Sequence, residues 1–156
     1  MDAGFVNAYL VAVQNVFKTM LRLDIAMGKP ALKKDRHSSG DVTGVIGFAG
    51  DKKGSFSLAF VREGAMFVYK RMIGEDVPSV TADVVDAIGE LTNIVSGQTR
   101  VQIEKLGYKL NAALPTVVVG HNVEINFITK VPLISLPFTY EADGEKGQVF
   151  LDFSFE

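Results

Sequence analysis

The sequence predicts an α+β protein in which an antiparallel sheet of about six strands carries two long helices and one shorter helix on one face. Apolar residues recur every three or four positions in three segments, as in helices that bury one side. In the other apolar segments they alternate with polar residues, as in strands of a sheet that is buried on one face. Helices and strands do not alternate along the chain as a parallel sheet requires, so the strands are expected to be antiparallel.

The composition predicts one globular domain over residues 1–156. With 47% hydrophobic and 22% charged residues, the chain can bury a sizeable core, and no linker-like or low-complexity stretch divides it. The formal net charge is −2, and the chain has no block of basic residues. This charge pattern argues against nucleic acid as a partner.

The absence of cysteine excludes disulfides, thiolate catalysis and cysteine-ligated zinc, and it suits a reducing cytoplasm. The apolar stretch near the N-terminus follows no basic segment. Polar residues from Gln14 to Arg22 interrupt that stretch before it reaches the length of a membrane span. We therefore expect a soluble cytoplasmic protein that does not enter a membrane.

The first two helices are predicted from their apolar stripes and their stop signals. The first covers about residues 5–27, and Gly28 with Pro30 marks its end. The second covers about residues 63–73, and Gly74 ends it.

The strands are predicted from alternation, and two Gly-containing turns join four of them into hairpins at residues 50–54 and 142–147. The predicted strands are residues 42–50, 54–61, 116–120, 122–131, 133–140 and 148–155.

The third helix, about residues 81–107, carries the polar cluster with the most chemical content. Thr81 is the predicted N-cap, and Asp83 lies in the first turn, where the helix dipole favours an acid. Gly107 is the predicted end of this helix.

One side of the third helix gathers polar residues and a glycine within an arc of about 60°. These residues are Asp86, Glu90, Asn93 and Gly97, and the apolar residues Val84, Ile88, Leu91 and Val95 point the opposite way. The polar side could be only the solvated face of an amphipathic helix. Gly89 and Gly97 weigh against that reading, because a glycine inside a helix costs about 1 kcal/mol relative to alanine. They suggest the close approach of another backbone, from within the fold or from a partner.

Other kinds of site find little support in the sequence. His37 and His121 stand in predicted loops without a second histidine or a carboxylate at metal-ligand spacing, so no metal site is predicted in this chain. The glycines of residues 40–50 alternate with apolar residues as in a strand, and no Lys-Ser or Lys-Thr pair closes a phosphate loop. No nucleophile-elbow motif supports a Ser-His-Asp triad.

The spacing Asp86-x-x-x-Glu90-x-x-Asn93 resembles the Asp/Ser-x-x-x-Glu-x-x-Asn motif of the CheC/CheX/FliY family of response-regulator phosphatases. The resemblance extends through most of the chain. CheC proteins typically carry two such motifs and FliY proteins add further domains, so the single copy here is most similar to the CheX-type branch. The flanking segments that are similar in order and spacing are residues 44–48, 54–60, 72–75 and 115–122.

The resemblance implies hydrolysis of the aspartyl phosphate on a phosphorylated CheY-like response regulator, in chemotaxis or another two-component pathway. It implies two catalytic residues: Asn93 positions the attacking water, and Glu90 pairs with the active-site lysine of the receiver domain. Asp86, Gly89 and Gly97 are expected to contact the partner. Mg²⁺ is expected on the receiver domain, and no cofactor is expected on this chain.

Two alternatives remain open from the residues alone. A protein of this fold could bind receiver domains, or a second copy of itself, without hydrolysing anything. A metal-dependent hydrolase of small phosphorylated molecules could use the same carboxylates. The resemblance further implies a homodimer formed through the sheet, with an edge near residues 116–131.

Overall fold

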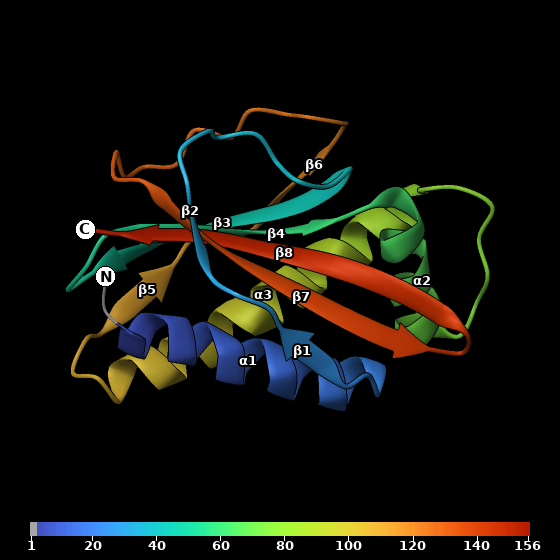
Figure 1. Ribbon diagram of the computed structural model, residues 1–156, viewed down its shortest axis with the longest axis horizontal. Coiled ribbons are helices and arrows are strands. Elements are labelled where there is room, and N and C mark those ends of the chain that lie inside the picture. Colours follow the sequence, from blue (N-terminus) through green and yellow to red (C-terminus); the bar gives the residue numbers. More distant parts are fainter. Residues whose placement is uncertain (1–2) are drawn as a thin grey trace.

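The computed structural model describes residues 3–156, so the first two residues of the predicted domain 1–156 lie outside the described residues. Within that range the chain forms three helices and eight strands (Figure 1). The helices are α1 (Ala3–Leu21), α2 (Arg62–Ile73) and α3 (Ala82–Glu104). The strands are β1 (Ile25–Met27), β2 (Ala31–Lys33), β3 (Val42–Gly50), β4 (Gly54–Phe60), β5 (Leu110–Ala112), β6 (Thr116–Val119), β7 (Leu133–Ala142) and β8 (Glu145–Phe155).

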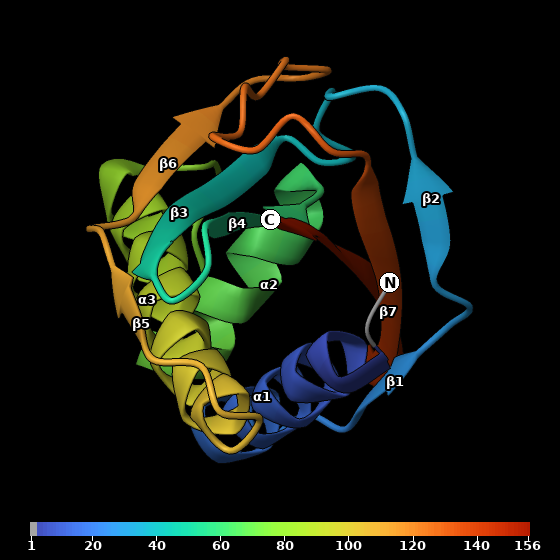
Figure 2. The ribbon, with the colours of Figure 1, turned by 90° about the vertical axis from the view of Figure 1, so that its left-hand side faces the viewer.

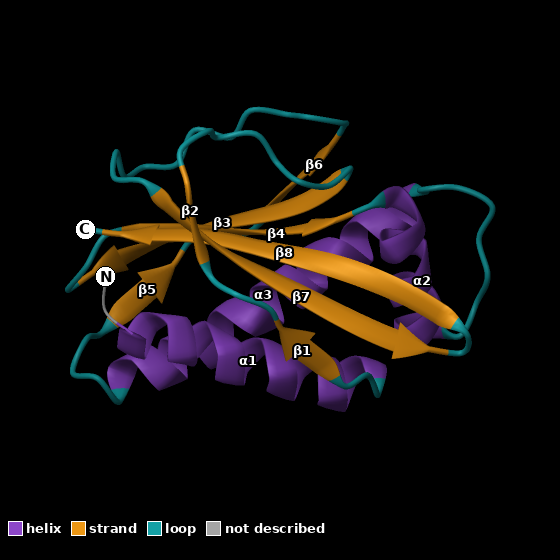
Figure 3. Ribbon diagram, viewed as in Figure 1, coloured by secondary structure: helices purple, strands orange, loops and turns teal. Residues whose placement is uncertain are grey.

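All the strands of the described chain belong to one antiparallel sheet (Figure 3). The order across it is β1-β7-β8-β4-β3-β5; β2 also pairs with β7, and β6 also pairs with β3. The predicted α+β class and the antiparallel sheet are therefore confirmed. The prediction of about six strands undercounts the eight in residues 3–156, because each outer position of the sheet is divided between two short strands.

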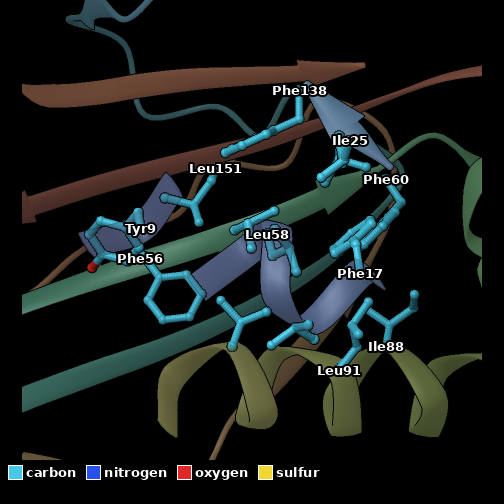
Figure 4. Packing of buried hydrophobic residues seen from close by; sticks show 14 of the residues in the cluster. Tyr9, Phe17, Ile25, Phe56, Leu58, Phe60, Ile88, Leu91, Phe138 and Leu151 are labelled. Atoms are coloured by element: carbon cyan, nitrogen blue, oxygen red, sulfur yellow. The ribbon is translucent and has the colours of Figure 1, made fainter. Parts of the chain in front are cut away.

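The three helices lie on the concave side of the curved sheet (Figure 2). Their apolar sides and the helix-facing side of the sheet form one core cluster, in which Tyr9, Phe17 and Phe56 are fully buried. Ile88 and Leu91 point from α3 toward Phe17 of α1 (Figure 4). This packing fixes α3 between α1 and the edge of the sheet formed by β3, β5 and β6.

The predicted first helix, residues 5–27, is too long. α1 ends at Leu21, and residues 25–27 form β1, which pairs with β7. Arg22 has a φ of 51°, which turns the chain out of the helix. The apolar residues continue through this turn into β1, so their spacing alone did not reveal the break. The guanidinium of Arg71 holds the turn, donating from Nε to the Leu21 carbonyl (2.9 Å) and from Nη2 to the Arg22 carbonyl (2.8 Å).

The predicted strand at residues 122–131 is also wrong. Every second residue from Val123 to Val131 is at least half-buried, as predicted, but within this segment only Glu124 forms a bridge, with His37. The segment runs with residues 34–41 across the convex face of the sheet (Figure 1), and the two stretches, here called the strap, exchange backbone bonds. Burial alternates here because an extended segment lies on the face of the sheet, although the segment is not a strand of that sheet.

A buried ion pair joins β2 to β8, and its lysine also holds the strap. Lys33 Nζ lies 2.8 Å from Asp152 Oδ2 of β8, and the two side chains are 14% and 3% exposed. Lys33 Nζ also donates to the His37 carbonyl (2.6 Å) and to Ser39 Oγ (3.1 Å). Lys33 therefore compensates the charge of a buried carboxylate, through its Oδ2, and binds the turn of the strap at the same time.

The remaining predicted elements agree with the structure to within a few residues. Gly74 ends α2 in the left-handed conformation, with a φ of 88°. The hairpin turns at residues 50–54 and 142–147 are present, although β7 and β8 extend further, and only Asp143 and Gly144 separate them. The strands that the sequence did not predict are β1, β2 and β5, each three residues long.

Gly44 sets the depth at which α3 packs on the sheet. A Cβ at this position would collide with the side chain of Thr92 on α3. Thr92 is fully buried, and its Oγ1 donates to the Ile88 carbonyl (2.7 Å), so its side chain has no freedom to move aside. The absence of a side chain at Gly44 is therefore what allows α3 to approach β3.

We predict that Gly44→Ala lowers the free energy of unfolding by about 2 kcal/mol, because the added methyl group overpacks the contact between β3 and α3. Gly47→Ala is the matched control, since the nearest atom to its added Cβ would be 4.0 Å away. Urea unfolding measures both. Equal stability of the two variants would contradict the close approach.

Candidate functional site

The candidate site lies on α3, and the core holds its buried side rigidly. Thr81 is the N-cap as predicted, and its Oγ1 accepts from the Val84 amide (3.3 Å). The helix ends at Glu104, and Gly107 follows with a φ of 98°. Four apolar residues on the core side have no exposed surface, as predicted: Val84, Ile88, Leu91 and Val95.

The three polar residues of the predicted motif share the exposed side of α3. Asp86, Glu90 and Asn93 are all solvent-exposed. In residues 3–156 none of these three side chains has a hydrogen bond or an ion pair, so their polar groups are free to meet a partner. Asn93 offers one carbonyl acceptor and two donors on a single planar group, and Glu90 offers a carboxylate one helical turn earlier.

The two glycines of α3 differ in their surroundings. A Cβ at Gly97 would meet no atom within 4 Å, so this position is an open notch beside Asn93. A Cβ at Gly89 would lie 3.3 Å from Val117 Cγ2 of β6. Gly89 therefore packs against the sheet edge, and its predicted contact with a partner stays a prediction.

The exposed side of α3 continues beyond the predicted motif to Arg100, which was not among the predicted site residues. Arg100 follows Asn93 by seven residues, so it projects from the same side of the helix, about two turns further on. This spacing was visible in the sequence. Beside the helix, β6 forms an outer strand of the sheet, and both Val119 on this strand and Leu114 just before it are exposed.

Each of the two histidines lies beside an aspartate, His37 beside Asp35 and His121 beside Asp41. His121 Nδ1 is 3.1 Å from Asp41 Oδ1, and the Arg62 amide donates to Asp41 Oδ2 (2.8 Å). The amide of Arg62 and then the imidazole of His121 lower the pKa of Asp41 below its ordinary value. Among residues 3–156, no three carboxylate or imidazole side chains are grouped to hold a metal ion, and no helix has the length and apolar character needed to cross a membrane.

Comparison with known proteins points to one family. The family model described as chemotaxis phosphatase CheX matches residues 42–139. The CheY-P phosphatase CheX of Thermotoga maritima is 31% identical over 137 residues, which cover 85% of this chain and 88% of that protein. Both matches contain the whole of α3.

Solved structures give the same result. A chemotaxis protein CheX from Desulfovibrio desulfuricans superimposes with a TM-score of 0.87 at 34% identity, covering 97% of this chain and 99% of that chain. A CheX–CheY–BeF3–Mg²⁺ complex from Borrelia burgdorferi has a TM-score of 0.76 at 22% identity, covering 97% of each chain. The second match, at this lower identity, supports the fold alone.

Proposed function

This chain belongs to the chemotaxis phosphatase CheX family, and from that premise we propose that it hydrolyses the aspartyl phosphate of a CheY-like response regulator in the cytoplasm. The observation that carries the proposal is the exposed, unpaired arrangement of Glu90 and Asn93 on one side of α3. A rigid helix that presents an unpaired amide can position a water molecule without rearranging itself.

Asn93 is the proposed water-positioning residue. Its carboxamide can accept a hydrogen bond from a water molecule and donate one to it, which fixes the water in line with the P–O bond. An aspartyl phosphate is an activated mixed anhydride, so a strong base is not required for the attack. If positioning the water raises the rate about 100-fold, it supplies about 2.7 kcal/mol.

Glu90 is the proposed anchor. Its carboxylate would form an ion pair with the active-site lysine of the receiver, which holds α3 so that Asn93 faces the phosphorus atom. Asp86, one turn before Glu90, and the notch at Gly97 would contact the receiver on either side of this pair.

The proposal leaves Mg²⁺ to the receiver domain, where it would neutralise charge on the phosphoryl oxygens. The exposed side of α3 fits this division, since Asp86 and Glu90 are its only carboxylates between residues 86 and 97 and it carries no imidazole. The residues of this chain orient the water and the receiver.

We also propose a homodimer through the outer edge of the sheet. Among the residues that the structure describes, β5 and β6 pair only with β3, so their other edges offer backbone groups that could pair with a second copy. Light scattering at micromolar concentration tests this, and a monomer would contradict it.

The function is tested by mixing the purified protein with receiver domains of the CheY type from the same organism, each labelled with ³²P on its aspartate. Faster loss of label from at least one receiver supports the proposal. Binding to a BeF3⁻-activated receiver without faster loss would instead support a non-catalytic binding module. Metal-dependent hydrolysis of free acetyl phosphate without a receiver would support a small-molecule hydrolase.

We predict that Glu90→Gln lowers kcat/KM for the phosphorylated receiver about 10-fold, or about 1.4 kcal/mol, mainly by raising KM. The change keeps the size of the side chain and removes only its charge. The difference in kcat/KM between the variant and wild type should become smaller at high salt, because the lost interaction is ionic. Glu141→Gln on β7 is the control, and an equal loss in both variants would exclude an anchoring role for Glu90.

A further inference from the structure

Arg100 is the only basic residue of α3, whose other charged residues are Asp83, Asp86, Glu90 and Glu104. Within residues 3–156 its guanidinium has no hydrogen bond, no ion pair and no aromatic ring as a partner. A charged group held at a fixed position without any partner is a candidate for binding another molecule.

The side chain of Arg100 is buried at Nε, and the end of its guanidinium is exposed to solvent. Nε is buried without a hydrogen-bond partner, whereas the two terminal nitrogens reach solvent. The planar guanidinium is therefore oriented before any partner arrives, and it loses little conformational freedom on binding. Two parallel N–H groups match the geometry of a carboxylate.

The distance from Asn93 decides which acceptor Arg100 can meet. Seven residues separate the two along α3, which corresponds to about 10 Å along the helix axis. If Asn93 faces the phosphorus atom through one water molecule, Arg100 lies beyond the phosphorylation pocket. An acceptor on the rim of that pocket fits this distance better than the phosphoryl group does.

Resting on the proposed function, we propose that Arg100 binds a carboxylate of the receiver domain on the rim of the phosphorylation pocket, and is a positioning and specificity residue. Glu90 then binds a cation on the receiver, and Arg100, two to three turns further along α3, binds an anion. A helix docked in the reverse direction would place like charges together. The pair therefore sets the direction in which α3 lies across the receiver.

The experiment compares wild type, Arg100→Ala, Arg100→Lys and the control Lys29→Ala, which removes an exposed charge from the opposite edge of the sheet. Three quantities are measured with a receiver that the wild-type protein binds: Kd for the BeF3⁻-activated form, and KM and kcat for the phosphorylated form. For Arg100→Ala we expect Kd and KM to rise about 10-fold with kcat within twofold of wild type. Arg100→Lys should recover part of the loss, and Lys29→Ala should match wild type.

The outcomes separate this inference from the proposed function. Unchanged Kd and KM in Arg100→Ala, or a fall in kcat without a change in Kd, would overturn the carboxylate contact while leaving the phosphatase intact. If wild type binds the receiver without hydrolysing its phosphate, the proposed function fails, and the Kd series still decides the role of Arg100. A wild-type protein that neither binds nor dephosphorylates any receiver would overturn both.

Discussion

Asn93→Ala is expected to lower the rate of receiver dephosphorylation about 100-fold, which corresponds to a loss of about 2.7 kcal/mol of transition-state stabilisation. The amide is lost and no side chain on the exposed side of α3 replaces it, since Asp86 and Glu90 can only accept hydrogen bonds when ionised and Arg100 can only donate them. Alanine is a better helix former than asparagine, so the variant should be at least as stable as wild type. A fall in activity would therefore report chemistry, not unfolding.

The measurement is the single-turnover loss of ³²P from the receiver, together with Kd for the BeF3⁻-activated form. The affinity should change less than twofold, because Asn93 is proposed to act on the water and not on the receiver. Gln98→Ala is the matched control, since it removes an exposed amide from the same helix about 140° away. Activity within threefold of wild type in Asn93→Ala would contradict the catalytic role.

Lys33→Met is expected to produce the largest loss of stability, about 3 kcal/mol in the free energy of unfolding. The reason is that Asp152 would be left as an uncompensated carboxylate in the sheet, where its side chain is 3% exposed. The second carboxylate oxygen, Oδ1, has no hydrogen-bond partner within residues 3–156, so the described part of the chain offers little compensation. Urea unfolding followed by circular dichroism measures the loss.

Two companion variants separate the ion pair from general effects of the strap. Lys34→Met changes the exposed neighbouring lysine, and stability within about 0.5 kcal/mol of wild type is expected. In the double variant Lys33→Met with Asp152→Leu, the buried charge is gone, and most of the stability should return. A double variant as unstable as Lys33→Met alone would show that Lys33 acts through its bonds to the strap instead.

The helices were largely predictable because their buried apolar residues recur every three or four positions along the sequence. The buried side of α3 was identified by four apolar residues, Val84, Ile88, Leu91 and Val95. The end of α2 was identified by the conformational preference of Gly74 alone. The predictions failed where the same pattern of apolar residues is compatible with two different structures. Ile25 continues the apolar stripe of α1 but is buried in a strand, and Ile125 alternates like a strand residue but lies in the strap.

The candidate site was predictable to the extent that one helix carries it. Helical spacing was sufficient to bring Asp86, Glu90 and Asn93 to one side, because an uninterrupted helix has a fixed geometry. The surroundings of that side depend on contacts between distant segments. The contact of Gly89 with Val117 follows from where β6 passes α3, which spacing within the helix does not specify, and the same spacing did not reveal that the position of Gly97 is open.

The anchoring of the motif in the middle of α3 has a kinetic consequence. Its side chains project from a helix whose core side is fully buried, between the N-cap at Thr81 and the end at Glu104. The backbone has no folding or opening step to complete before a receiver arrives, so association should follow the rate of diffusional encounter and respond to ionic strength. If the proposed contacts of Glu90 and Arg100 form, the lifetime of the complex is the quantity that sequence changes on this helix should alter most readily.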